Sequence, residues 1–185
     1  MSNQPTYKMV WGKHDELRDI ALEVAYQQLP NILVNQRGEG ILKSQISLRG
    51  LDHKTFEKLA RWEESGRRIA EWDWREVRKK YRTHPKRFEL SIWHNDIFLC
   101  GASIGRPTWS GNKLRLDFIE ANPSGSPLSG TIADIVILSG KLYAKAIGAS
   151  EIRIMNPVND KVRNYYMSKG GFKFDSVGNF CFQEI

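Results

Sequence analysis

The stretch between residues 114 and 172 constrains the fold of this chain more than any other. A strand pattern over residues 114–121 leads into a loop of small residues at 124–130 and then an amphipathic helix pattern that Gly148 closes. A second strand at 151–155 and a second helix pattern, which ends at Gly170-Gly171, follow it. This alternation of strands and helices predicts an α/β arrangement.

The remaining segments predict elements on both sides of that stretch. A helix from Asp15 precedes a turn-rich link at 35–40, a strand at 45–49 and a helix capped by Asp52. A basic helix over residues 67–87, two strands and a final hairpin complete the order. We predict a mixed, mostly antiparallel, twisted sheet flanked by helices. Residues 1–43 are expected to form an N-terminal helical extension, and residues 44–185 the main domain, in one compact unit.

Size and composition favour one folded domain. The chain has 185 residues, a hydrophobic fraction of 41% and six tryptophans, which is typical of a globule with a real core. No apolar run of about 18 residues occurs, so we expect no membrane span. Residues 1–13 lack the apolar core of a signal peptide. The two cysteines, Cys100 and Cys181, are expected to be buried free thiols in a cytoplasmic protein.

The positive charge is concentrated in one segment. The net charge is +7, and residues 67–87 alone hold nine basic and three acidic side chains. On a helix, Trp74, Val77 and Tyr81 would share one face. The adjacent face would carry the basic residues Arg75, Arg78, Lys79 and Arg82. Two interpretations are open: a solvated helix face, or a patch that binds phosphates by Coulomb attraction and counterion release.

Two motifs and the order of elements resemble the acyl-CoA N-acyltransferases of the GNAT superfamily. Ala121-Asn122-Pro123 stands where the family has V-x-P after its central strand. The run from Asn159 through Tyr166 to Phe172 stands where the family has N-x-x-A-x-x-x-Y-x-K-x-G-F, with one extra residue before Phe172. The pyrophosphate loop, usually [QR]-x-x-G-x-[GA], departs most, because Ser126 replaces the Arg or Gln and only Gly130-Thr131-Ile132 loosely matches G-x-[GA].

The resemblance implies a coenzyme A-dependent N-acyltransferase that moves an acetyl group from acetyl-CoA to an amine by direct attack. Backbone groups of the central strand would hold the pantetheine arm, and free N–H groups at a helix N-terminus would bind the diphosphate. The implied cofactor-binding residues are Ala121, Asn122, Ser129, Gly130, Thr131 and Asn159. Helix capping alone would also explain Asn159.

The implied catalytic residues are Tyr166, Asp117 and Glu120. Tyr166 stands where the family often has the tyrosine that protonates the coenzyme A thiolate, although packing would also explain both Tyr165 and Tyr166. Strand alternation predicts that Asp117 and Glu120 point to opposite faces of the sheet. We expect Asp117 to be the general base, whereas Glu120 has an ion pair with an arginine as its alternative role. The histidines and cysteines show no metal-ligand spacing, so no metal is expected.

The acceptor side follows from the same resemblance. The amine would approach past Trp72, Asp73 and Trp74, beside the basic residues of the 67–87 segment. That charge predicts an anionic acceptor, such as an aminoacyl-tRNA or an acidic protein surface. The alternative is a catalytically degenerate GNAT-fold module that binds nucleic acid or a protein through the basic helix.

Overall fold

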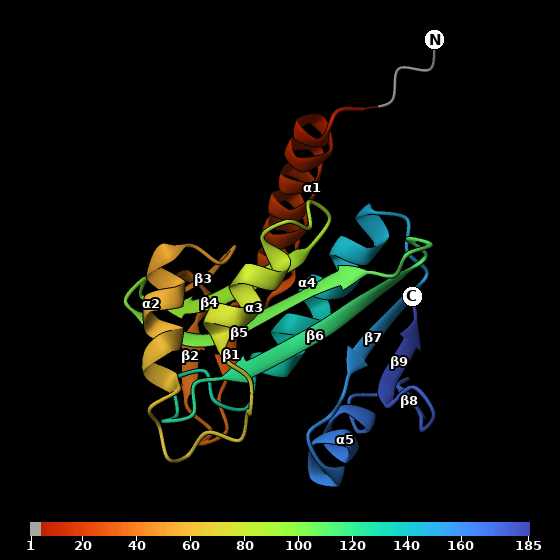
Figure 1. The fold of residues 1–185 in the computed structure, drawn as a ribbon. Helices are drawn as coiled ribbons and strands as arrows, with labels where there is room; N and C mark the ends of the chain where they lie inside the picture. Colours follow the sequence, from red (N-terminus) through yellow and green to blue (C-terminus); the bar gives the residue numbers. More distant parts are fainter. Residues whose placement is uncertain (1–4) are drawn as a thin grey trace.

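A seven-stranded sheet runs through the centre of the molecule (Figure 1). The computed structural model describes residues 5–185. In sheet order the strands are β3 (Ile46–Arg49), β4 (Phe88–His94), β5 (Phe98–Pro107), β6 (Lys113–Ala121), β7 (Glu151–Met155), β9 (Phe180–Glu184) and β8 (Lys173–Asp175). All neighbouring strands are antiparallel except β6 and β7, which are parallel. The predicted α/β fold with a mixed, mostly antiparallel sheet is therefore confirmed.

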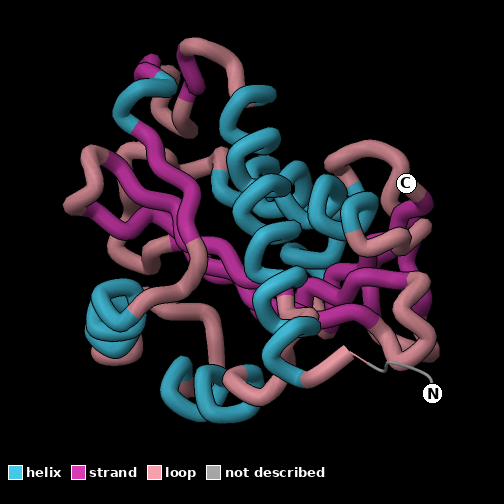
Figure 2. Tube along the Cα trace, turned by 90° about the horizontal axis from the view of Figure 1, so that it is seen from above, coloured by secondary structure: helices cyan, strands magenta, loops and turns pink. Residues whose placement is uncertain are grey.

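Helices cover both faces of the sheet (Figure 2). On one face lie α1 (Tyr7–Gln28), α4 (Ile132–Ala146) and α5 (Asp160–Met167), which share a core with β4, β6 and β7. On the other face, α2 (His53–Trp62) and α3 (Trp74–Tyr81) pack a second, aromatic-rich core against β4 and β5. The N-terminal helix contributes Ala21, Leu22 and Leu29 to the first core.

The basic helix is shorter than predicted. Residues 67–73 are irregular, and α3 begins only after Asp73, whose carboxylate accepts hydrogen bonds from the N–H groups of Arg75 and Glu76. A capping aspartate fixes a helix start because it satisfies N–H groups that have no partner within the helix. The expected helix over residues 67–87 is thus wrong at both ends, whereas the predicted buried face of Trp74, Val77 and Tyr81 is confirmed.

The N-terminal segment also differs from the prediction. α1 begins at Tyr7, capped by Thr6, eight residues before the expected start at Asp15. The turn-rich link is flanked by two short strands, β1 (Ile32–Val34) and β2 (Gly40–Leu42), which pair as a separate hairpin. A short 3-10 helix, Lys43–Gln45, then leads into β3. Cys100 and Cys181 are free and buried, as predicted.

Candidate active site

The candidate site lies where β6 and β7 separate. Their parallel pairing begins at Lys113 with Glu151 and ends at Leu116 with Ile154. Beyond this point the two strands diverge (Figure 1), so residues 117–121 of β6 have no strand partner on the β7 side. A cavity of about 430 Å³ opens there, with walls from β6, the end of β7, α5 and the loop between α2 and α3.

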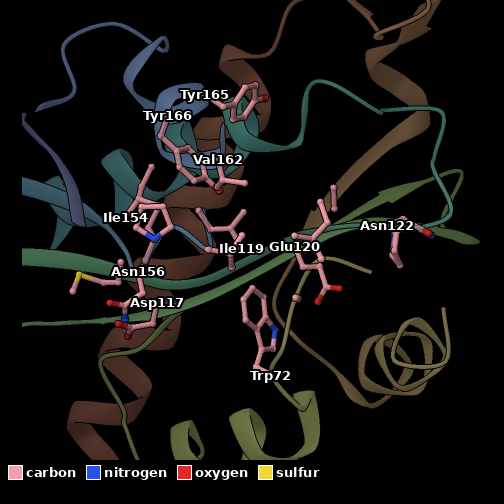
Figure 3. A pocket seen from close by; sticks show the side chains of 18 of the residues that line it. Trp72, Asp117, Ile119, Glu120, Asn122, Ile154, Asn156, Val162, Tyr165 and Tyr166 are labelled. Atoms are coloured by element: carbon pink, nitrogen blue, oxygen red, sulfur yellow. The ribbon is translucent and has the colours of Figure 1, made fainter. Parts of the chain in front are cut away.

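A β-bulge decides how the carboxylates of β6 are oriented. Ile104 of β5 pairs with Phe118 and Gly105 pairs with Leu116, so Asp117 is an extra residue without a partner on β5. One extra residue reverses the alternation of side chains that follow it. The prediction of opposite faces is therefore wrong: Asp117 contacts Tyr81 of α3, and Glu120 contacts Trp74 of the same helix. Figure 3 shows both carboxylates on the Trp72 side of the strand, with Tyr165 and Tyr166 on the other.

Asp117 lines the cavity and is held by two donors. Its Oδ1 accepts a hydrogen bond from Nη2 of Arg115 at 2.6 Å, and its Oδ2 accepts one from the Tyr81 hydroxyl. Burial, reinforced by the neighbouring Asp117 charge, raises the pKa of Tyr81 far above its ordinary value. Tyr81 therefore stays protonated and keeps donating to Asp117. The carboxylate is fixed beside the cavity in one orientation.

Glu120 is committed to a structural network. Arg68 donates to both of its oxygens, at 2.8 Å and 3.2 Å, and the indole N–H of Trp74 donates at 2.6 Å. Arg68 also donates to the carbonyl of Trp72, so the network ties the α2–α3 loop to β6. The arginine pair that the sequence left as an alternative for Glu120 is present. Three hydrogen bonds from two residues therefore hold the Glu120 carboxylate in place.

Tyr166 projects from α5 toward the separated strands (Figure 3). Its side chain is buried and lines the cavity, and its hydroxyl makes no hydrogen bond with any residue of the described chain. Burial, followed by the nearby Tyr165 and Cys181, raises the pKa of Tyr166 well above its ordinary value. The hydroxyl therefore carries its proton at neutral pH and is available to a group in the cavity.

Tyr165 lies beside Tyr166 but has a different environment. Their ring centroids are 5.7 Å apart, and Tyr165 is 40% exposed. Lys169 lies over the Tyr165 ring, 4.5 Å from its centroid, and is paired with Asp134 in the first turn of α4. Tyr165 also lines the cavity, where it forms part of the rim.

The loop between β6 and α4 uses most of its donors internally. The N–H groups of Ser126, Leu128, Ser129 and Thr131 all bond to other groups of the loop. The hydroxyls of Ser129 and Thr131, predicted as cofactor contacts, donate to the carbonyls of Ser126 and Leu128. Gly130 has a φ of 90°, which only glycine adopts without strain. No Arg or Lys occurs in residues 116–140.

Of the other predicted cofactor residues, two line the cavity and Asn159 does not. Ala121 and Asn122 line it, and the Asn122 side chain donates to Leu99 O and accepts from the Ser124 N–H. Asn159 caps α5 by accepting from the Val162 N–H at 2.9 Å. The capping role that the sequence left open for Asn159 is therefore present.

The α2–α3 loop supplies one wall of the cavity. Trp72 lines the cavity, and its Nε1 is buried without a hydrogen-bond partner in the described chain. Arg67 also lines the cavity, is exposed, and forms no ion pair within residues 5–185. Arg67, Arg68 and Tyr81 were not recognised as site residues from the sequence. Their separation from β6 along the chain leaves no local signal that could have found them.

The predicted basic residues gather around a second hollow. A groove of about 650 Å³ lies between α2 and α3. Its cationic lining residues are Arg75, Arg78, Lys79 and Arg82. Glu57 also lines the groove. Lys79 pairs with Glu76, and the Arg78 guanidinium lies 4.6 Å from the centre of the Phe56 ring. Trp74 reaches the groove as well, whereas Asp73 remains at the helix cap.

The part of the chain that the structure describes shows neither a metal-binding cluster nor a helix suited to span a membrane. Within residues 5–185, no group of three or more His, Cys, Asp or Glu side chains is placed to hold a metal ion. No helix in that part of the chain is long and apolar enough to cross a membrane.

The fold is similar to that of solved N-acetyltransferase structures. No family model matches the sequence, and no curated protein matches it by sequence. The similarity is structural.

Three solved structures illustrate it. Spermidine N-acetyltransferase from Vibrio cholerae, in complex with CoA and spermine, aligns with a TM-score of 0.58 and 12% identity, covering 76% of this chain and 96% of that one. PaiA N-acetyltransferase from Thermoplasma acidophilum, in complex with coenzyme A, has a TM-score of 0.54 and 19% identity over 76% and 99% of the two chains. Ard1 from Thermoplasma volcanium aligns with a TM-score of 0.57 and 12% identity, covering 76% of this chain and 98% of that one.

The residues present fit a coenzyme A-type molecule. The unpaired edge of β6 offers backbone groups to an extended amide chain, as an additional strand would use them. The Tyr166 hydroxyl, which has no partner in the described chain, adds a polar group at the cavity. The loop before α4 offers few free N–H groups to a phosphate, because most of them donate to other groups of the loop.

Proposed function

We propose that this protein is a coenzyme A-dependent N-acyltransferase, most simply one that transfers an acetyl group from acetyl-CoA to an amine. The observation that carries the proposal is Tyr166 at the cavity between β6 and β7: its side chain is mostly buried, and its hydroxyl has no hydrogen-bond partner in the described chain. A phenol hydroxyl that has no protein partner and lies at a cavity is able to donate a hydrogen bond to a bound ligand. A bound acyl-CoA supplies the thioester that an amine attacks.

The two faces of the sheet would contribute different groups to the reaction. Tyr166, from the α5 side, holds a proton at its hydroxyl in the place where a departing thiolate needs one. Asp117, from the α3 side, offers a carboxylate to the ammonium proton of the incoming amine, oriented by Arg115 and Tyr81. Glu120 holds Arg68 and Trp74 and shapes the wall.

The acceptor would be an amine that also carries an anionic group. Both carboxylates of the cavity wall are paired with arginines of the protein, whereas Arg67 has no such partner within residues 5–185. A polyamine would find no uncommitted carboxylate among these lining residues, whereas a carboxylate or phosphate would find a cation. An acidic peptide or an aminoacyl-tRNA has this chemistry.

A binding role remains the second candidate. The groove between α2 and α3 collects four cationic side chains, and its charge suits a phosphate backbone. The two roles are compatible, because the groove and the cavity share no lining residue.

Release of free thiol from acetyl-CoA, measured with a panel of amines, tests the enzyme proposal. We expect turnover with acidic peptides and little with spermidine. Arg67→Glu should lower kcat/KM for the acidic peptide by about tenfold, whereas Arg61→Glu, an equal change of charge on α2, should not. Thiol release that is fastest with spermidine would contradict the anionic acceptor. A cofactor that binds without turnover of any amine would favour the binding role.

A further inference from the structure

The β1–β2 hairpin is docked on the loop that precedes α4. The N–H of Gln36 donates to the carbonyl of Ser129 at 2.7 Å, and the Asn35 side chain donates to the carbonyl of Pro127 at 3.0 Å. Gly130 packs against the same hairpin, since a Cβ there would lie 3.0 Å from Cβ of Gln36. The N-terminal segment therefore forms part of the surroundings of this loop.

Asn35 makes the hairpin tip rigid. It is 6% exposed, and its Oδ1 accepts hydrogen bonds from the N–H groups of Arg37 and Glu39 at 2.9 Å and 3.0 Å. Its Nδ2 donates to Glu39 as well as to Pro127. A buried asparagine with all these bonds holds the backbone of Arg37 in a fixed position relative to the loop.

A hollow of about 420 Å³ lies between the hairpin tip and the loop. Gln36 and Arg37 line one side, and the other side is formed by Ser124, Gly125, Ser126, Pro127 and Ser129. Arg37 is the charged residue in this lining. Along the loop, the lining of the larger cavity reaches Asn122 and Pro123, and the lining of the hollow begins at the next residue, Ser124.

The geometry points to Arg37 as a phosphate-binding residue for the coenzyme A of the proposed function, on which this inference rests. The loop has no cation of its own, and the donors of Ser126, Leu128, Ser129 and Thr131 are engaged. Arg37 supplies the missing positive charge from a different part of the chain. A guanidinium binds phosphate oxygens through two parallel hydrogen bonds and brings a full positive charge to them.

Arg37 is free to exchange its present partner. It pairs with Glu39 at 3.2 Å, with the two side chains 69% and 55% exposed. An exposed pair of this kind contributes little stability, so a phosphate competes with it readily. Lys169, the cation on the α5 side of the loop, is different: it is 19% exposed and held by Asp134 at 2.9 Å.

Isothermal titration of the full-length chain with coenzyme A tests the assignment. Arg37→Ala should weaken binding about tenfold, and Arg37→Lys should restore part of the loss. Lys145→Ala is the matched control, because it also removes one cation but lies at the far end of α4, roughly 20 Å along the helix from the loop. Equal affinities of wild type and Arg37→Ala would overturn the assignment, whereas a wild type that binds no coenzyme A would overturn the proposed function instead.

Two further titrations identify the phosphate and the role of the hairpin. Dephospho-coenzyme A lacks the 3′-phosphate but keeps the diphosphate. If Arg37→Ala still weakens its binding about tenfold, Arg37 binds the diphosphate. If the effect of the substitution disappears with this ligand, Arg37 binds the 3′-phosphate. Pantetheine should bind wild type and Arg37→Ala equally; a loss with pantetheine would overturn the assignment, because that ligand has no phosphate. Asn35→Ala should weaken coenzyme A binding by loosening the hairpin. Tighter binding by Asn35→Ala would show that the hairpin covers the loop and would overturn the inference.

Discussion

The indole N–H of Trp74 donates to the Glu120 carboxylate at 2.6 Å, and both side chains are buried. Arg68 completes the arrangement from the irregular segment before α3, at 2.8 Å from the same carboxylate. The three residues join α3, the α2–α3 loop and β6 at the wall of the cavity. The segment that carries Arg67 and Trp72 is therefore positioned by Glu120.

Replacing Glu120 with Gln should destabilise the protein by about 3 kcal/mol. The change keeps the shape of the side chain but leaves the buried Arg68 guanidinium without a counter-charge, which is costly. Chemical denaturation measures the loss. Glu57→Gln is the control: its exposed pair with His53 should contribute less than about 0.5 kcal/mol. Equal losses in the two variants would show that the network has no special energetic role.

Gly105 makes the bulge beside Asp117 feasible. A Cβ at this position would collide with the backbone carbonyl of Arg115 on β6. Gly105→Ala should therefore cost at least about 3 kcal/mol of the free energy of unfolding, because backbone must move. Gly12→Ala is the matched comparison in an exposed part of α1 with nothing within 4 Å of the new Cβ, and it should raise stability by about 0.5 to 1 kcal/mol. A Gly105→Ala variant as stable as wild type would contradict the bulge.

The order of elements could be predicted from the sequence because each element has a local signal. Asp52 and Asn159 cap α2 and α5, and each accepts a hydrogen bond from the residue three positions later. Trp74, Val77 and Tyr81 recur at helical spacing and form the buried face of α3. Tyr166 was placed by its motif, and it lines the cavity.

The parts that were missed depend on contacts between distant segments. The bulge at Asp117 arises from the pairing of β5 with β6, and simple alternation cannot reveal one extra residue. The Arg68–Glu120 pair joins residues 52 positions apart. The extent of the basic helix was overestimated because arginine and lysine favour helices, whereas the Asp73 cap and the Arg68 contacts set its actual start.

Tyr166→Phe should lower kcat about a hundredfold with little change in cofactor affinity, because it removes only the proton donor. Tyr165→Phe should change kcat by less than about threefold, since its ring lies at the exposed rim. Steady-state kinetics and a binding titration of both variants separate the two effects. Equal, small effects would assign both tyrosines to packing.

The raised pKa of Tyr166 also predicts a pH dependence. The folded protein keeps the phenol protonated, whereas in the unfolded chain tyrosine ionises near pH 10. The unfolded state therefore binds fewer protons above about pH 10, and the contribution of Tyr166 to stability declines there. Wild type should lose stability between about pH 10 and 11 more steeply than Tyr166→Phe in denaturation experiments. Parallel curves would contradict the buried, protonated phenol.

The groove between α2 and α3 should bind RNA or DNA with a strong salt dependence. Three to four phosphate contacts predict a log–log slope of roughly −2 to −4. Reversing Arg78 and Lys79 to Glu should abolish this binding and leave coenzyme A affinity unchanged. Reversing Lys145 and Lys173, two exposed lysines that do not line the groove, controls for net charge. No binding at low salt would leave this side of α3 as a solvated face.

The central claim is that the cavity between the separated β6 and β7 accepts coenzyme A. Calorimetric titration of the wild-type protein with acetyl-CoA and with free coenzyme A tests it directly. We expect saturable binding of both, with a Kd in the micromolar range, which corresponds to a binding free energy of about −8 kcal/mol. The absence of any heat at millimolar acetyl-CoA, together with an unchanged Tm, would contradict it.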